Sequence, residues 1–105
     1  EALEAGARFI LVLGGSGFGV GNYAPEVVRS IVEVEIPGIA EQIRAHGLTN
    51  TPLSGLSREV VGVTARDSSG ALIVSSPGSR GGALDTLEVV TPLLAAIFHQ
   101  LDEQR

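Results

Sequence analysis

The chain contains no cysteine among its 105 residues, and this absence removes a whole group of functions. Disulfide bonds, thiolate metal sites and cysteine nucleophiles are all excluded. Lysine is missing as well, so every basic side chain apart from histidine is an arginine. Aromatic residues make up only 4% of the chain, which predicts a core of valine, leucine, isoleucine and alanine. With 44% hydrophobic residues, a chain of this length is expected to form one globular domain.

Positive charge is also scarce. The formal net charge is −5, and the arginines are scattered along the chain. An acidic domain of this kind is a poor match for a nucleic-acid backbone or an anionic membrane surface. The apolar runs are too short to cross a bilayer, and no signal peptide precedes them. We therefore expect a cytoplasmic protein with no nucleic-acid partner and no membrane association.

The stretch from Phe9 to Glu26 organises the rest of the sequence. Its apolar run, which ends at Leu13, predicts a strand buried on both faces, as in a parallel sheet covered by helices. A loop that is about half glycine follows, and Pro25 then stands where the first residue of a helix belongs. A strand that delivers a glycine-rich loop to a helix N-terminus is typical of anion-binding sites, because a ligand can approach bare backbone N–H groups there.

Further helices are predicted after this loop. Apolar spacing extends the first helix to a break at Pro37-Gly38, and a second helix is predicted from Ile39 to His46. The final helix is predicted over residues 83–104, with a kink at Pro92. Residues 1–6 resemble the last turn of another helix.

Two β-branched segments, residues 59–64 and 71–75, are predicted as strands that form a hairpin or lie as neighbours around a turn. The segment before them is irregular, with one short helical turn after Thr51. A second flexible loop leads from the later strand into the final helix. If both loop-bearing strands run parallel in one sheet, loops 14–22 and 77–82 face one pocket.

The first loop lacks the motifs of the common nucleotide-binding folds. Val20 or Asn22 occupies the third glycine position of the dinucleotide fingerprint, and a P-loop would need a lysine. The chain also has no Gly-x-Ser-x-Gly nucleophile elbow. Its two histidines show no metal-ligand spacing, so His46 is interpreted as a solvated cap residue and His99 as a surface or interface residue. We assign no catalytic and no metal-ligating residue.

Several polar side chains near these loops have two interpretations. Ser16 could bind a ligand or cap its own loop, and Asn22 could contact a ligand or serve as a turn residue. Glu26 is most simply a carboxylate at a helix N-terminus, with a role in the pocket as the alternative. Arg58 could pair with a phosphate or with a carboxylate such as Glu41.

Two acidic residues of the final helix also have a simple interpretation. Asp85 and Glu88 are expected to be solvated or to interact with the positive end of the helix dipole.

Four short motifs follow one another along nearly the whole chain. They are Gly14-Gly15-Ser16-Gly17 with Ala24-Pro25-Glu26; Pro37-Gly38 with Glu41 and Arg44; Leu56-Ser57-Arg58 with Gly62; and Pro77-Gly78-Ser79-Arg80. Their order resembles the molybdopterin-binding domain family of the MoaB/Mog type, which acts in molybdenum cofactor biosynthesis. The corresponding family motifs are Gly-Gly-Thr-Gly with Arg-Asp-x-Thr-Pro-Glu, Pro-Gly-x-x-Glu-x-x-Arg, Leu-Ser-Arg followed by Gly, and Pro-Gly-Ser-Pro.

The resemblance implies an α/β fold with three layers, in which helices cover a mostly parallel sheet. Residues 1–105 would form the C-terminal two-thirds of the family domain, without its N-terminal portion. The resemblance also implies a homotrimer and a pocket in which both loops hold a molybdopterin and its phosphate. Matching the motifs position by position gives these candidate substrate-binding residues: Gly14, Gly15, Ser16, Gly17, Asn22, Glu26, Pro77, Gly78 and Ser79.

Catalytic members of the family transfer adenylate from ATP to molybdopterin with a divalent cation, so ATP and Mg²⁺ are further implied ligands. In this chain Gly21-Asn22 stand where the family has Arg-Asp, Ala24 replaces its Thr, and Arg80 replaces its second Pro. Asn22 can accept a hydrogen bond but has no charge with which to hold Mg²⁺. The sequence therefore leaves three alternatives: an adenylyltransferase-type enzyme, a non-catalytic trimeric scaffold or carrier of the same fold, and an unrelated α/β module for another phosphorylated ligand.

Overall fold

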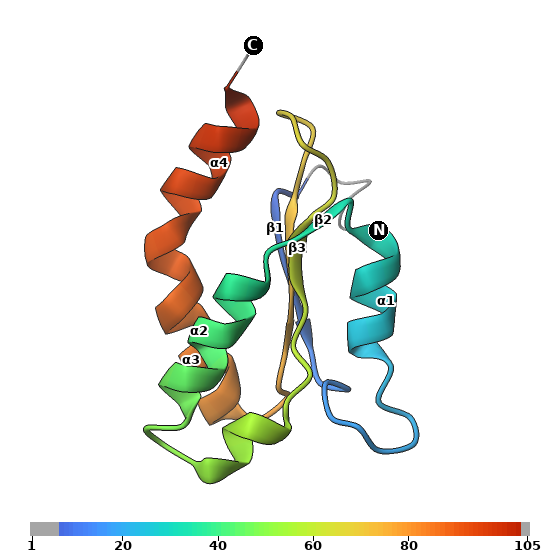
Figure 1. Cartoon of the computed structure of the whole chain (residues 1–105), viewed down its shortest axis with the longest axis vertical. Helices are drawn as coiled ribbons and strands as arrows, with labels where there is room; N and C mark the ends of the chain where they lie inside the picture. The colour runs from blue at the N-terminus through green and yellow to red at the C-terminus, as the bar shows by residue number, and fades with distance from the viewer. Residues whose placement is uncertain (1–6, 104–105) are drawn as a thin grey trace.

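The computed structural model describes residues 7–103, which form a four-stranded sheet between layers of helices (Figure 1). The strand order is β1-β4-β3-β2. Strands β1 (Phe9–Leu13) and β4 (Leu72–Ser76) run parallel, with Phe9 opposite Leu72 and Leu13 opposite Ser76. Strand β3 (Val61–Val63) is antiparallel to β4, and β2 (Val34–Glu35) is antiparallel to β3.

The α/β fold with three layers is thus confirmed, but the sheet is mixed and not mostly parallel. Among the described strands, only the pair β1–β4 is parallel. The physical reason is the short connection between β3 and β4, because a parallel pair needs a crossover of a dozen or more residues. The hairpin, one of the two arrangements expected for these strands, is the one that forms.

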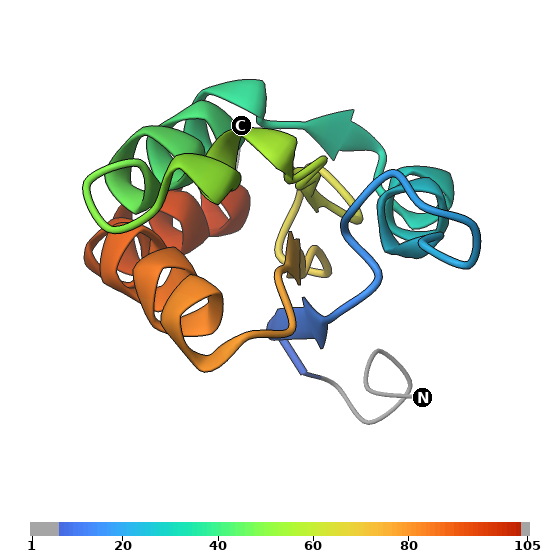
Figure 2. The ribbon, with the colours of Figure 1, turned by 90° about the horizontal axis from the view of Figure 1, so that it is seen from below.

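Helices cover both faces of the sheet. Helix α1 (Ala24–Ile31) lies on one face, and α2 (Pro37–Gly47), α3 (Arg80–Val90) and α4 (Leu94–Asp102) lie together on the other (Figure 2). The expected helical turn after Thr51 is present as the 3₁₀ helix η1 (Pro52–Leu56). The expected helix end within residues 1–6 lies outside the described part of the chain.

The final helix bends where the proline predicts. Helix α3 ends at Val90, the 3₁₀ turn η2 (Thr91–Leu93) contains Pro92, and α4 continues to Asp102. Judged by length and composition alone, the 23-residue segment from Arg80 to Asp102 could cross a membrane. Several apolar side chains of this segment, Val90 and Leu101 among them, pack into the core, as a helix covering a sheet requires, whereas Leu84 is exposed. The absence of membrane association stays a prediction.

The core has two apolar layers, one on each face of the sheet. Leu72 and Val74 of β4 are fully buried against the side of α2, α3 and α4. Ile73 points to the opposite face, where it meets Val28 of α1 and Val60. This alternation follows from the two-residue period of a strand and places the apolar residues of β4 in both layers.

The first helix is shorter than predicted, and an edge strand follows it. Helix α1 ends at Ile31, and β2 is held to β3 by hydrogen bonds from Glu33 N to Val63 O at 2.9 Å and from Ile36 N to Val61 O at 2.7 Å. A Cβ atom on Gly62 would lie 2.6 Å from the carbonyl oxygen of Val34. The glycine at this position therefore permits the close approach of β2.

Candidate functional site

Both glycine-rich loops leave the same end of the sheet, as expected for parallel strands. The backbone N–H of Gly14 donates a hydrogen bond to the carbonyl oxygen of Ser76 at 2.9 Å. A Cβ atom on Gly78 would lie 3.2 Å from the Cα of Gly14, so the backbones of the two loops are in close contact. Figure 1 shows the first loop, η1 and the start of α3 at this lower end of the molecule.

The backbone of the first loop requires glycine at its start. Gly14 and Gly15 have φ angles of 85° and 66°, in the left-handed region where side chains are strained. Asn22 closes the loop on itself, because its Oδ1 accepts a hydrogen bond from Gly17 N at 3.3 Å. This hydrogen bond connects the front and the back of the loop.

A cavity of about 580 Å³ lies between the two loops, η1 and the N-terminal end of α3. Four of the candidate substrate-binding residues line this cavity: Ser16, Gly17, Pro77 and Ser79. Gly14, Gly15 and Gly78 belong to the same two loops but are not among the lining residues. Asn22 and Glu26 are not among the lining residues. The structure thus brings together part of the set that the motifs predict.

Glu26 is held by Arg58. The guanidinium donates hydrogen bonds from Nη1 to Glu26 Oε2 at 2.6 Å and from Nη2 to Oε1 at 3.2 Å. The hydrogen bond from Arg58 lowers the pKa of Glu26. Arg58 also donates to the carbonyl oxygens of Gly17 and Asn22, each at 2.8 Å. Of the two sequence-based interpretations of Arg58, pairing with a carboxylate is the one observed, although the partner is Glu26 and not Glu41.

A buried carboxylate that no sequence signal singled out lies in the cavity wall. Glu59 is 6% exposed, and the Thr86 hydroxyl donates a hydrogen bond to its Oε2 at 3.2 Å. Burial raises the pKa of Glu59 to about 7. The side chain can therefore gain or lose a proton near neutral pH.

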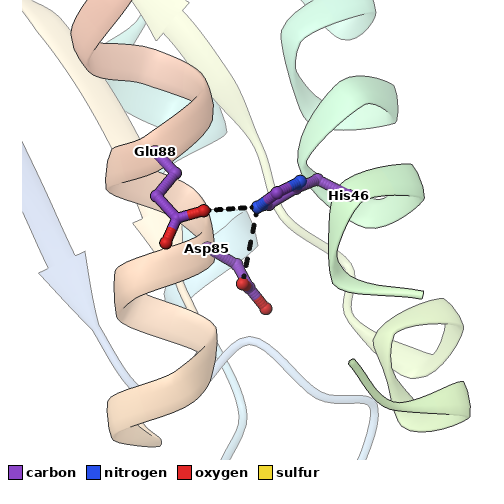
Figure 3. A group of neighbouring side chains, drawn as sticks. All are labelled: His46, Asp85 and Glu88. Carbon is purple, nitrogen blue, oxygen red and sulfur yellow. Dashed lines mark hydrogen bonds and ion pairs between the residues drawn. The ribbon is translucent and has the colours of Figure 1, made fainter. Parts of the chain in front are cut away.

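A second polar group joins α2 to α3. His46 Nε2 lies 2.7 Å from Glu88 Oε2 and 3.7 Å from Asp85 Oδ1 (Figure 3). His46 lies in the last turn of α2 with 37% of its side chain exposed, so the prediction of a partly solvated residue at this helix end agrees with the structure. Its contacts with α3 were not predicted, and the interpretation of Asp85 as solvated is wrong, because Asp85 is 8% exposed. Helix packing brings these residues together from distant parts of the sequence. His99 is exposed on α4, as predicted.

The cavity offers donors suited to an anionic group. Ser79 caps α3 by accepting a hydrogen bond from Gly82 N at 3.1 Å, and Gly81 and Gly82 line the cavity at the positive end of this helix. Ser57 lies in the same wall, and its hydroxyl is close enough to Glu59 to lower the pKa of that carboxyl, against the effect of burial.

Comparisons with known proteins agree with this arrangement. Residues 1–96 match the family model described as a probable molybdopterin binding domain. The chain is 34% identical over 94 residues to a molybdenum cofactor biosynthesis bifunctional protein of Chlorobaculum tepidum, covering 90% of this chain and 28% of that protein. It is 34% identical over 87 residues to a molybdopterin adenylyltransferase of Haemophilus influenzae, covering 83% and 42%.

A solved structure shows the same fold. The molybdopterin biosynthesis Mog protein of Mycobacterium ulcerans superposes with a TM-score of 0.85 at 37% identity. The match covers 95% of this chain and 63% of that one, so the chain spans less than two thirds of its relatives. The match to the family model covers more than nine-tenths of the sequence. The chain therefore belongs to the molybdopterin-binding domain family of molybdenum cofactor biosynthesis proteins.

Proposed function

We propose that this domain binds molybdopterin in the cavity between its two glycine-rich loops. The observation that carries this proposal is that Ser16 and Gly17 from one loop and Pro77 and Ser79 from the other line one cavity of about 580 Å³. This volume lies within the range of about 300–1,000 Å³ that is usual for small-molecule sites. The names of the relatives support a pterin as the ligand.

The phosphate of the ligand fits best at the start of α3. The backbone N–H of Gly82 donates to Ser79 Oγ, whereas those of Arg80 and Gly81 have no partner within the helix and lie at the positive end of its dipole. Gly81 leaves this end open, because a Cβ at its position would meet nothing within 4 Å. The hydroxyl of Ser16, which also lines the cavity, supplies a further donor.

Adenylyl transfer, with ATP and Mg²⁺, is the finer function that the adenylyltransferase relatives suggest. The back half of the first loop does not fit a Mg²⁺ ion, because Asn22 is neutral and Glu26 is bound by Arg58. This observation favours the second candidate, a non-catalytic carrier or scaffold of molybdopterin. The homotrimer implied by the resemblance and the cytoplasmic location expected from the composition belong to the same proposal.

Calorimetric titration of the folded chain with molybdopterin, and separately with ATP, tests the proposal. Saturable binding of molybdopterin is expected, and its absence in a folded sample would contradict the proposal. Turnover of ATP and molybdopterin by the wild-type chain would contradict the carrier alternative. Asn22→Asp is the informative variant, because an aspartate can still accept the hydrogen bond from Gly17 while it restores the charge found in the family motif.

A further inference from the structure

We propose that His46, Asp85 and Glu88 form a binding site for a divalent metal ion of the zinc class. The site would connect the C-terminal end of α2 to the middle of α3 (Figure 3). It is separate from the pterin proposal, since it requires no ligand in the cavity. Each of the three residues offers one ligand atom, and these atoms all lie within 4.8 Å of one another.

The distances suit a small tetrahedral ion. Zinc bonds to nitrogen and oxygen of about 2.0–2.2 Å place neighbouring ligand atoms roughly 3.3–3.6 Å apart. The imidazole Nε2 is 2.7 Å from Glu88 Oε2 and 3.7 Å from Asp85 Oδ1, so these separations lie on both sides of the required value. The Glu88 side chain is 62% exposed and can adjust, whereas Asp85 is fixed in the wall.

The donor set selects the class of metal. An imidazole nitrogen with two carboxylates suits zinc and similar transition metals, whereas Ca²⁺ and Mg²⁺ prefer oxygen ligands alone. Three protein ligands leave a fourth position for water or for a ligand in the cavity that Asp85 lines. With no cysteine in the chain, thiolates cannot compete for the ion.

Charge gives an independent argument for a cation. Asp85 is 8% exposed, and among residues 7–103 His46 is the one basic group within 4 Å of its carboxylate. Asn50 Nδ2 donates a hydrogen bond to Asp85 Oδ1 at 2.8 Å, which fixes the orientation of the carboxylate, as hydrogen bonds to ligating carboxylates do in metal sites. A metal ion at this position would compensate the buried negative charge of Asp85.

Zinc titration of the full chain, without an affinity tag and after removal of metals with a chelator, tests the proposal. We expect one zinc ion to bind per chain and the melting temperature to rise with zinc. His46→Gln and Glu88→Gln should each weaken binding by at least about tenfold, as loss of a ligand requires. His99→Gln is the matched control, because it removes the other histidine of the chain, and it should bind zinc like the wild type.

Three outcomes would overturn the proposal: no zinc binding by the wild-type chain, unchanged affinity in His46→Gln, and an equal loss in His46→Gln and His99→Gln. Circular dichroism of each variant without metal shows whether it folds. Glu88→Gln serves as the second variant because its exposed side chain makes a folding defect improbable. Substitution with Co²⁺ adds a spectroscopic readout, since three protein ligands in a tetrahedral site give intense visible absorption that should disappear with His46→Gln.

Discussion

Arg58 and Glu26 meet end to end, with both terminal nitrogens of the guanidinium donating to the two carboxylate oxygens, at 2.6 and 3.2 Å. The same guanidinium reaches the carbonyl oxygens of Gly17 and Asn22 at 2.8 Å. One side chain from the segment before β3 thus fixes both the glycine-rich loop and the first turn of α1. This geometry gives the Leu-Ser-Arg motif a physical role in shaping the cavity.

Arg58→Lys is expected to loosen the first loop even though it keeps the charge. A lysine ammonium cannot reproduce the planar fork that reaches several acceptors at once. Amide hydrogen exchange measured on peptides that cover residues 14–22 should accelerate by at least about tenfold, because hydrogen bonds to a charged group are lost. Arg29→Lys is the control, since Arg29 pairs with Glu35 away from the loop. Unchanged exchange in Arg58→Lys would contradict this role.

Gly62→Ala is expected to destabilise the sheet edge. The added Cβ would lie 2.6 Å from the carbonyl oxygen of Val34 and 2.9 Å from the side chain of Val32, so β2 would have to move. The free energy of unfolding should fall by roughly 1–3 kcal/mol, as is usual when a packed site is overfilled. Urea denaturation measures this change. Gly55→Ala, where the new Cβ meets nothing within 4 Å, should change stability by less than about 0.5 kcal/mol, and equal losses would refute the steric explanation.

Glu59 should make stability depend on pH. Because burial raises the pKa of Glu59 from 4.5 to about 7 in the folded chain, the folded state holds this proton to higher pH than the unfolded state. Stability should therefore decrease as pH rises from 4.5 through about 7. Asp85 strengthens this shift, whereas Arg44 and the hydrogen bond from Thr86 oppose it.

Glu59→Gln removes this titration while keeping an acceptor for Thr86. The unfolding free energy of the wild type should fall between pH 5 and pH 8 by roughly 1–3 kcal/mol more than that of the variant. Urea denaturation at both pH values measures the difference. Glu41→Gln, an exposed substitution on α2, should leave the pH dependence of the wild type intact. Parallel curves for the wild type and Glu59→Gln would show that Glu59 does not titrate in this range.

Sequence reasoning predicted most of the fold because strong local signals mark its elements. The apolar run before Gly14, the proline at the start of α1 and the kink at Pro92 each act through neighbouring residues. The short strand β2 was missed, although alternation from Val32 to Ile36 is a strand signal. Its apolar residues also continued the helical pattern of α1, and only pairing with β3 decides between the two structures.

The site was predictable only in part, for a similar reason. Each glycine motif follows a predicted strand, so parallel pairing of the two strands predicts that Ser16 and Ser79 lie near one another. The structure has this pairing between β1 and β4. By contrast, the contact of His46 with Asp85 and Glu88 depends on how α2 packs on α3, which no local pattern encodes. The burial of Glu59 depends on Thr86 and the cavity wall in the same way.

If molybdopterin binds in the cavity between the two loops, Gly81→Leu should weaken its binding. Gly81 lines the cavity, and a Cβ atom at its position would meet nothing within 4 Å. The fold should therefore tolerate the substitution, while the larger side chain reduces the space for the ligand. Gly38→Leu is the matched control, because Gly38 is likewise the second residue of its helix and equally open. In calorimetric titration with molybdopterin, Gly81→Leu should bind at least about tenfold more weakly than Gly38→Leu and the wild type. Equal affinity in all three proteins would show that molybdopterin does not bind in this cavity.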